Sequence, residues 1–168
     1  MTEHVDVIVV GAGLSGIGAA WHLQQRCPDR SYAILEARHA IGGPWDLFRY
    51  PGIRSDSDLY TFGYRFKPWT GAPIATAEEI LRYMGEVIAD NGLARHIRYR
   101  HTIASARWSS ADNLWTVEGR RTDTDEPFRI TASFLWMCQG YYRHHEGYMP
   151  DWPGMADFKG RIVHSEKW

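Results

Sequence analysis

A glycine-rich turn between an apolar run and a helical segment constrains this sequence more than any other feature. Residues 5–10 read VDVIVV, and Gly11, Gly13 and Gly16 follow at once. A short β-branched run is typical of a parallel strand that is buried on both faces. In a strand–turn–helix unit, the first glycine permits the tight turn and the second lets the backbone approach a pyrophosphate. The third lets the helix pack on the strand, and the helix N-terminus, with Ser15, favours bound phosphate.

A second strand and an acidic residue complete a nucleotide-binding pattern. Residues 19–26 have helical composition and residues 31–36 read SYAILE, which together predict a βαβ unit of about 30 residues. Glu36 follows Gly16 by 20 residues. A carboxylate at this point accepts hydrogen bonds from both ribose hydroxyls of an adenosine and repels a 2′-phosphate. The pattern predicts a site for FAD or NAD, not NADP; a glycine turn without a ligand is the alternative.

A glycine pair favours FAD over NAD. Five residues separate Glu36 from Gly42 and Gly43, and Pro44 and Trp45 follow. This spacing resembles the extended FAD pattern of flavoproteins similar to glutathione reductase. Two glycines after the second strand let the backbone pass close over the pyrophosphate and ribityl chain, and Trp45 offers a flat face to the isoalloxazine. The alternative is a plain turn.

The rest of the chain predicts one helix, several short strands and a loop-like tail. Residues 76–90 form an amphipathic helix with a capping box at Thr76 and Glu79. Strands are expected at 104–108, 114–120, 128–131 and 133–138. Aromatic residues alternate over 60–66, which fits a strand, core packing or an apolar channel beside the flavin. The expected fold is α/β: a Rossmann-like FAD-binding domain with three layers, a parallel sheet and a small antiparallel β-meander. Residues 1–140 form this domain and residues 141–168 form a linker.

Composition excludes several classes of function. The chain has 168 residues, about one domain, with 19 Lys and Arg against 20 Asp and Glu. Its net charge of -1 disfavours nucleic-acid binding, and it has no run apolar enough to span a membrane and no signal-peptide pattern. Two distant cysteines, Cys27 and Cys138, disfavour a disulfide framework or a metal site. We expect a cytoplasmic protein, with no metal and no inferable protein partner.

Two longer segments resemble one enzyme family. Residues 45–56, WDLFRYPGIRSD, resemble the segment after the FAD turn in class B flavin monooxygenases, especially Baeyer–Villiger monooxygenases. Residues 158–168 match the Phe-x-Gly-x3-His-x3-Trp fingerprint of that group, from Phe158 to Trp168. Two positions depart from the family: Cys138-Gln139-Gly140 stands where Ala-Thr-Gly is common, and Pro44 stands where Thr is common.

The resemblance implies a reaction for a longer parent enzyme. Such enzymes use NADPH to reduce FAD and then O2 to insert oxygen into a ketone, and some oxygenate sulfur. An N- or S-oxygenating flavin monooxygenase is the alternative within the enzyme class, and a non-catalytic FAD-binding module is the alternative outside it. Family members carry a second dinucleotide turn for NADPH, which this sequence lacks. The sequence is therefore expected to be the N-terminal part of such an enzyme, inactive by itself, with NADPH bound mainly by another domain.

The resemblance also implies roles for individual residues. Asp56 matches a family aspartate near the flavin, although its position alone equally fits an acid in a turn. His164 matches the fingerprint histidine at the linker to the NADPH domain. Asp56 and His164 are the expected catalytic residues. The expected cofactor-binding residues are Gly11, Gly13, Ser15, Gly16, Glu36, Gly43, Pro44, Trp45, Asp46, Leu47, Arg54, Asp56, Ile103 and Gly140.

Overall fold

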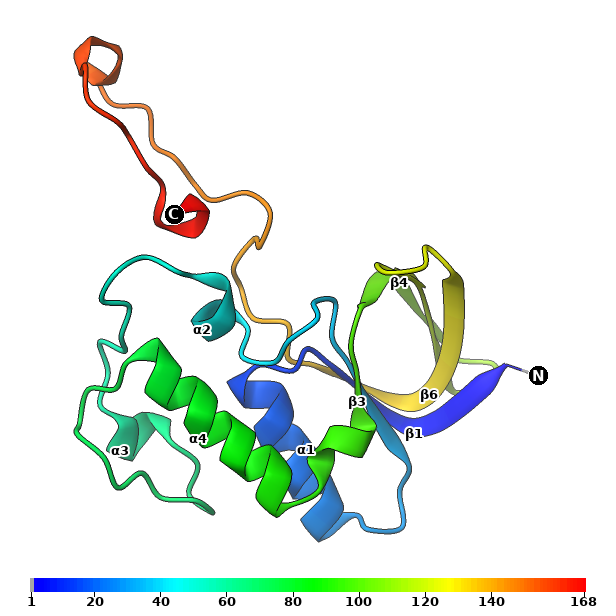
Figure 1. The fold of residues 1–168 in the computed structure, drawn as a ribbon. Helices are drawn as coiled ribbons and strands as arrows, with labels where there is room; N and C mark the ends of the chain where they lie inside the picture. The colour runs from blue at the N-terminus through cyan, green and yellow to red at the C-terminus, as the bar shows by residue number, and fades with distance from the viewer. Residues whose placement is uncertain (1) are drawn as a thin grey trace.

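The computed structural model describes residues 2–168 and has a six-stranded sheet in the order β3-β2-β1-β6-β5-β4 (Figure 1). The strands are β1 (Glu3–Val10), β2 (Tyr32–Leu35), β3 (Ile97–Arg98), β4 (His101–Ser109), β5 (Leu114–Arg121) and β6 (Pro127–Met137). β1 pairs in parallel with β2 and β6, and β2 pairs in parallel with β3. β4, β5 and β6 form an antiparallel meander. The expected α/β fold, with a parallel sheet and a meander, is confirmed.

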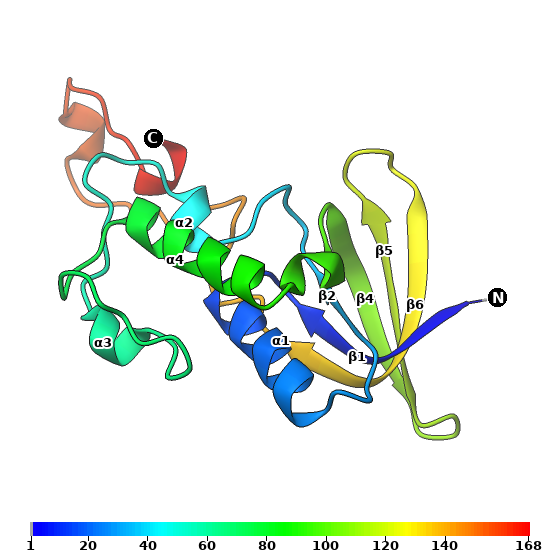
Figure 2. The same ribbon diagram turned by 60° about the horizontal axis from the view of Figure 1, so that its bottom comes forward.

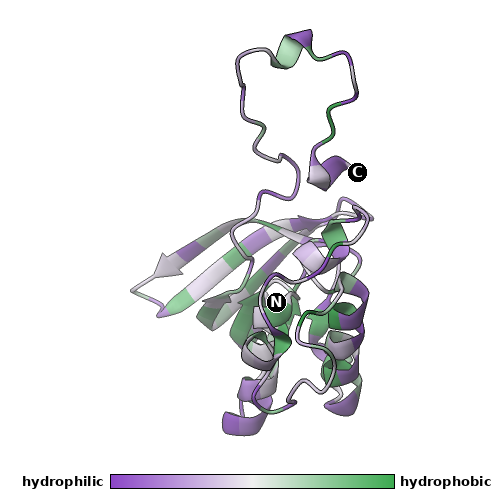
Figure 3. Cartoon of the chain, turned by 90° about the vertical axis from the view of Figure 1, so that its left-hand side faces the viewer, coloured by the Kyte–Doolittle hydropathy of each residue, from purple (hydrophilic) through white to green (hydrophobic). Residues whose placement is uncertain are grey.

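Two long helices cover one face of the parallel strands. They are α1 (Leu14–Arg26) and α4 (Ala77–Asp90), which lie side by side in Figures 1 and 2. Val7, Val9 and Ile34 from the strands pack with apolar residues of both helices. The expected capping box begins α4: the Thr76 side chain accepts from the Glu79 amide, and the Glu79 carboxylate accepts from the Thr76 amide. Figure 3 shows hydrophobic residues concentrated in the strands beside these helices.

The meander forms a third layer on the opposite face. A second apolar cluster joins Ile8 and Leu35 of the parallel strands to Val117 and Ile130 of the meander. Because successive strand residues point to opposite faces, Ile34 contacts the helix side while Leu35 contacts the meander side. The parallel strands are thus buried on both faces, which explains their continuous apolar sequence.

Two features differ from the expected secondary structure. Residues 128–131 and 133–138 are predicted as two strands but fall in the single strand β6, which ends at Met137, because residues 127–132 pair with β5 and residues 130–137 pair with β1. The alternating aromatic segment is not a strand. It begins in the one-turn helix α3 (Leu59–Phe62), where the Asp58 carboxylate accepts from the Thr61 amide. A second one-turn helix, α2 (Pro44–Leu47), follows the glycine pair.

The C-terminal segment leaves the sheet after β6 and extends away from the body (Figure 1). It contains two short 3₁₀ helices, η2 (Met155–Asp157) and η3 (Ser165–Lys167); a third, η1 (Leu93–His96), precedes β3. Among residues 2–168, no helix has the length and apolarity needed to cross a bilayer. The same residues contain no cluster of three or more His, Cys, Asp or Glu side chains suited to a metal ion.

Candidate functional site

A cavity of about 610 Å³ opens where β1, β2 and β6 end. These strands are parallel, so their carboxyl ends meet at one edge of the sheet, the place where open α/β sheets bind ligands. The volume lies within the range of cofactor pockets. The predicted site residues that line it are Gly11, Gly13, Ser15, Glu36, Gly43, Pro44, Trp45, Arg54, Asp56 and Gly140.

The glycine turn between β1 and α1 forms the floor of this cavity. Gly11 has φ +98°, and a Cβ there would lie 2.8 Å from the Cys138 carbonyl oxygen. A Cβ on Gly16 would lie 1.9 Å from the Gly11 carbonyl oxygen, so that glycine lets the helix begin against the turn. A Cβ on Gly13 would meet no atom within 4 Å. Since Gly13 lines the cavity, its open side is where a ligand can touch the backbone.

No side chain within residues 2–168 caps the start of α1. The first intrahelical bond runs from the Ile17 amide to the Gly13 carbonyl at 3.1 Å. The amides before Ile17 belong to the first turn, where a helix has donors without an intrahelical partner and a partial positive charge. This end of α1 therefore suits a phosphate group.

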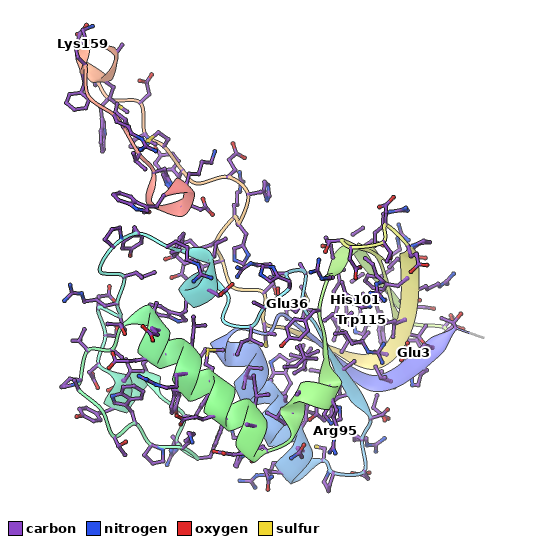
Figure 4. The ribbon with its side chains drawn as sticks, viewed as in Figure 1. Glu3, Glu36, Arg95, His101, Trp115 and Lys159 are labelled. Atoms are coloured by element: carbon purple, nitrogen blue, oxygen red, sulfur yellow. The ribbon has the colours of Figure 1, made fainter. Side chains whose placement is uncertain are left out.

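Glu36 is buried, with 7% of its surface exposed, and lies beside the start of α1 in Figure 4. Its Oε2 accepts from the Ala12 amide and its Oε1 from the Arg38 amide, each at 2.8 Å. The carboxylate thus ties the glycine turn to the end of β2. A carboxylate has about four acceptor positions, so two remain for the ribose hydroxyls predicted from the sequence.

The glycine pair after β2 packs directly against the glycine turn. The Gly42 amide donates to the Ala12 carbonyl at 3.0 Å. Gly43 has φ +54°, and its ideal Cβ position is 3.8 Å from the Gly13 Cα. Pro44 and Trp45 then begin α2 at the cavity wall. Two turns that are 29 residues apart, counted from Gly13 to Gly42, form one backbone cradle.

Aromatic and charged side chains line the rest of the cavity. Phe48 and Tyr142 pack edge to face, with ring centroids 5.5 Å apart. Arg54 and Asp56 line the same cavity, and the Arg54 Nε donates to the Gly52 carbonyl at 3.1 Å. A hydrogen bond with Tyr141, then burial and nearby negative charge that includes Asp56, raises the pKa of Tyr142. The alternating aromatic segment divides: Phe62 lines the cavity, whereas the rings after it pack against α1 and α4.

Five predicted site residues do not line this cavity. Gly16 and Ile103 serve packing, at the start of α1 and in the meander cluster respectively. Asp46 pairs with Arg38 and Arg49, behind the cavity wall, and Leu47 ends α2. His164 lies in the C-terminal segment, at a separate cavity of about 250 Å³.

Sequence reasoning missed several residues that line the cavity. Among them are Leu14, Tyr141, Tyr142 and His144. The available signal was position: residues that follow a parallel strand lie at the carboxyl edge of the sheet. Cys138 and Gln139, noted as departures from the family, also line the cavity, and their backbone passes over Gly11.

The residues present fit FAD. The open side of Gly13 and the uncapped start of α1 suit a pyrophosphate, and the spare acceptor positions of Glu36 suit a ribose. Trp45 and Phe62, whose centroids are 6.0 Å apart, supply apolar surface for a flat ring system.

Comparisons with known proteins agree with this geometry. Residues 9–72 match the family model described as NAD(P)-binding Rossmann-like domain. The chain is 55% identical over its whole length to the FAD-containing monooxygenase EthA of Mycobacterium tuberculosis, of which it covers 34%. It is 45% identical over its whole length to the putative FAD-containing monooxygenase MymA of the same species, again covering 34%. The chain thus spans about one third of the length of these curated relatives.

A solved structure supports the same relationship. The crystal structure of cyclohexanone monooxygenase from Rhodococcus sp. Phi1 bound to NADP+ superimposes with a TM-score of 0.77 and 28% identity. It matches 100% of this chain and 31% of the other. The resemblance to flavin monooxygenases that was expected from the sequence is confirmed.

Proposed function

We propose that this chain is the FAD-binding part of a longer flavin monooxygenase. Its whole length is similar to about one third of the length of each FAD-containing monooxygenase described above. The longer enzyme would use NADPH and O2, as the bound ligands and names of its relatives suggest. The observation that carries the proposal is the cradle of Gly11, Gly13 and Gly43 at the carboxyl ends of three parallel strands.

Each part of the cavity has a role in holding the cofactor. The start of α1, with Gly13 and Ser15, binds the pyrophosphate through backbone amides and a hydroxyl. Glu36 accepts from the adenosine ribose while it keeps its two backbone bonds. Trp45 borders the flavin ring.

FAD held by these residues would supply the redox chemistry, namely hydride acceptance from NADPH and activation of O2. The residues of this chain orient the ring, exclude water and place charge near it. Phe48, Phe62 and Tyr142 form apolar walls, and removing water from such a site strengthens the electrostatic interactions inside it. Asp56 and Arg54 contribute opposite charges at the same wall.

The substrate class is a ketone, with sulfur compounds as a second class. The proposal rests on the fingerprint from Phe158 to Trp168 and on the aromatic wall of the cavity. His164 lies outside the cavity, in the C-terminal segment, which fits a role in coupling domain movement to turnover. A cytoplasmic location is part of the proposal, and it is supported by Cys27 and Cys138, which are both free thiols.

The test is a cofactor titration of the full-length protein. Purified protein should carry FAD at near one equivalent, seen in its visible absorbance, and the apoprotein should quench added FAD in proportion to its sites. NAD+ added at the same concentration should not compete. A colourless protein that binds NAD+ in place of FAD would refute the proposal.

Assays with added substrates test the proposed oxygenation activity. The holoenzyme should oxidise NADPH faster when phenylacetone is added, and mass spectrometry should find the ester. A thioether in place of the ketone tests sulfur oxygenation. Oxidation of the thioether alone would favour an S-oxygenating enzyme.

A further inference from the structure

The most buried ion pair among residues 2–168 lies directly behind the proposed flavin site. Arg38 and Asp46 have side chains that are only 19% and 12% exposed, and the Arg38 Nη2 contacts the Asp46 Oδ2. Neither residue lines the cavity. A paired, desolvated charge contributes little net stability compared with apolar side chains of similar size. Its presence here therefore calls for a different physical reason.

Arg38 connects three segments, and two of them, at Glu36 and Gly43, line the cavity. Its Nη1 donates to the Gly43 carbonyl at 3.1 Å, and its backbone amide donates to Glu36 at 2.8 Å. Its carbonyl accepts from the Arg100 amide, just before β4, at 2.9 Å. The planar guanidinium reaches Gly43 and Asp46 at once, because it presents several donors in a fixed fork.

Asp46, the partner of Arg38 in the ion pair, connects it to α2. It lies in α2, one residue after Trp45, and its second oxygen accepts from the Arg49 Nη2 at 2.7 Å. Gly43 has φ +54°, which glycine adopts without strain, so hydrogen bonds select this conformation among those open to it. The ion pair thus fixes the turn before α2 and the helix itself against the end of β2.

We propose that Arg38 and Asp46 are a positioning pair that holds Gly43 and Trp45 in the geometry that binds the flavin cofactor. This inference rests on the proposed function, and it goes beyond it by assigning a role to two residues that do not face the cofactor. Arg38 acts through the Gly43 carbonyl, and Asp46 acts through Arg38. The pair sets cofactor affinity more than it sets the stability of the fold.

A double substitution separates these two effects. In the full-length protein, Arg38→Met leaves Asp46 buried with only an exposed partner, Arg49, so it should lower both the Tm of the apoprotein and the affinity for FAD. Arg38→Met combined with Asp46→Leu removes both charges. Its apoprotein Tm should return close to the wild-type value. Its affinity for FAD should stay about tenfold weaker, because Gly43 still lacks its donor.

The measurements are the Kd of FAD, from quenching of flavin fluorescence, and the Tm of each apoprotein. Arg49→Met is the matched control: Arg49 contacts the same carboxylate but is 65% exposed, so its Kd should change less than about twofold. If the double variant binds FAD as tightly as wild type, the positioning role is wrong. If it does not fold, Arg38→Lys serves instead, with unchanged Tm and weaker FAD binding expected; unchanged binding overturns the proposal.

The same titration distinguishes failure of the two proposals. A wild-type apoprotein that takes up no FAD contradicts the proposed function itself. A wild-type protein that binds FAD, with variants that bind it equally well, contradicts only the positioning pair.

Discussion

At the scale of single residues, the three glycines of the first turn meet three different physical demands. Gly11 has a positive φ and lies under the backbone of Cys138. Gly16 has the carbonyl of Gly11 where a Cβ would be, so only glycine fits. Gly13 has an extended backbone and open space beside it. Its constraint therefore comes from the ligand and not from the fold.

This difference predicts opposite outcomes at two neighbouring glycines. Gly13→Val should leave the unfolding free energy within about 0.5 kcal/mol of wild type and should weaken FAD binding by about 1–3 kcal/mol, since the side chain occupies ligand space. Gly16→Ala should destabilise the fold by more than about 4 kcal/mol, because its Cβ overlaps backbone. Urea unfolding and FAD titration measure the two effects. Equal tolerance at both positions would show that the phosphate lies elsewhere.

Glu36 has a structural role in addition to the predicted ribose contact. Glu36→Ala leaves the Ala12 and Arg38 amides without their acceptor, and should lower the unfolding free energy by about 1–3 kcal/mol even without cofactor. Asp56→Ala is the control, because that carboxylate also lines the cavity but is exposed. It should change stability by less than about 0.5 kcal/mol. Urea unfolding of the apoproteins compares them; an unaffected Glu36→Ala variant would contradict this role.

At the scale of elements, a short helix between α4 and β3 packs against the sheet. The 3₁₀ helix η1 places the ring of His96 on Tyr32 of β2, with centroids 4.0 Å apart. The His96 Nε2 accepts from the Arg95 Nε at 3.0 Å, so its Nδ1 carries the proton and faces the Tyr32 carbonyl at 3.2 Å. This arrangement requires a neutral ring. Burial, together with the charge of Arg95, lowers the pKa of His96 below its usual 6.5.

The lowered pKa predicts a loss of stability on acidification. Between the folded and unfolded pKa values the unfolded chain binds more protons, so the free energy of unfolding falls as the pH drops below about 6.5. It stops falling, for this group, below the folded pKa. His96→Phe keeps an aromatic ring at this position but removes the group that titrates. Urea midpoints at about pH 7.5 and pH 5 should therefore differ less in this variant than in wild type; an equal difference would exclude His96 as the source.

At the scale of the whole molecule, the cavity depends on three segments that are distant in sequence. β1, β2 and β6 bring residues 11–15, 36–57 and 138–144 to one edge of the sheet. Among residues 2–168, the described cavity of this kind lies at that edge, and the chain spans about one third of its curated relatives.

The proposed function predicts how residues 1–168 behave when they are produced alone. We expect this chain to bind FAD, because the glycine cradle and Glu36 lie within it, and to show no NADPH oxidation above free FAD. Stopped-flow absorbance under anaerobic conditions measures flavin reduction by NADPH directly. Dithionite is the control that shows whether the bound flavin can be reduced at all. Reduction by NADPH at the rate of the full-length protein would contradict the prediction.

The sequence by itself determined the βαβ unit, the capped helix α4 and most of the cofactor cradle. These features depend on interactions between residues near each other in the chain: β-branched runs, a capping box, and glycines that a turn requires. The same local rules failed where pairing partners are distant. Residues 127–137 form one strand because β5 pairs with residues 127–132 and β1 pairs with residues 130–137, and neither contact has a local signal.

Only the tertiary structure decided which side chains face the cofactor site and which support it. Asp46 was expected in the site, but its carboxylate pairs with Arg38 behind the wall, while Tyr142 reaches the cavity from beyond β6. Gly18 also shows that tertiary packing decides the space available to a side chain. Helix propensity alone favours alanine there, yet the Tyr64 ring lies 3.0 Å from the ideal Cβ. Side-chain direction, and the space left for a side chain, depend on packing between distant segments, which a single sequence does not specify.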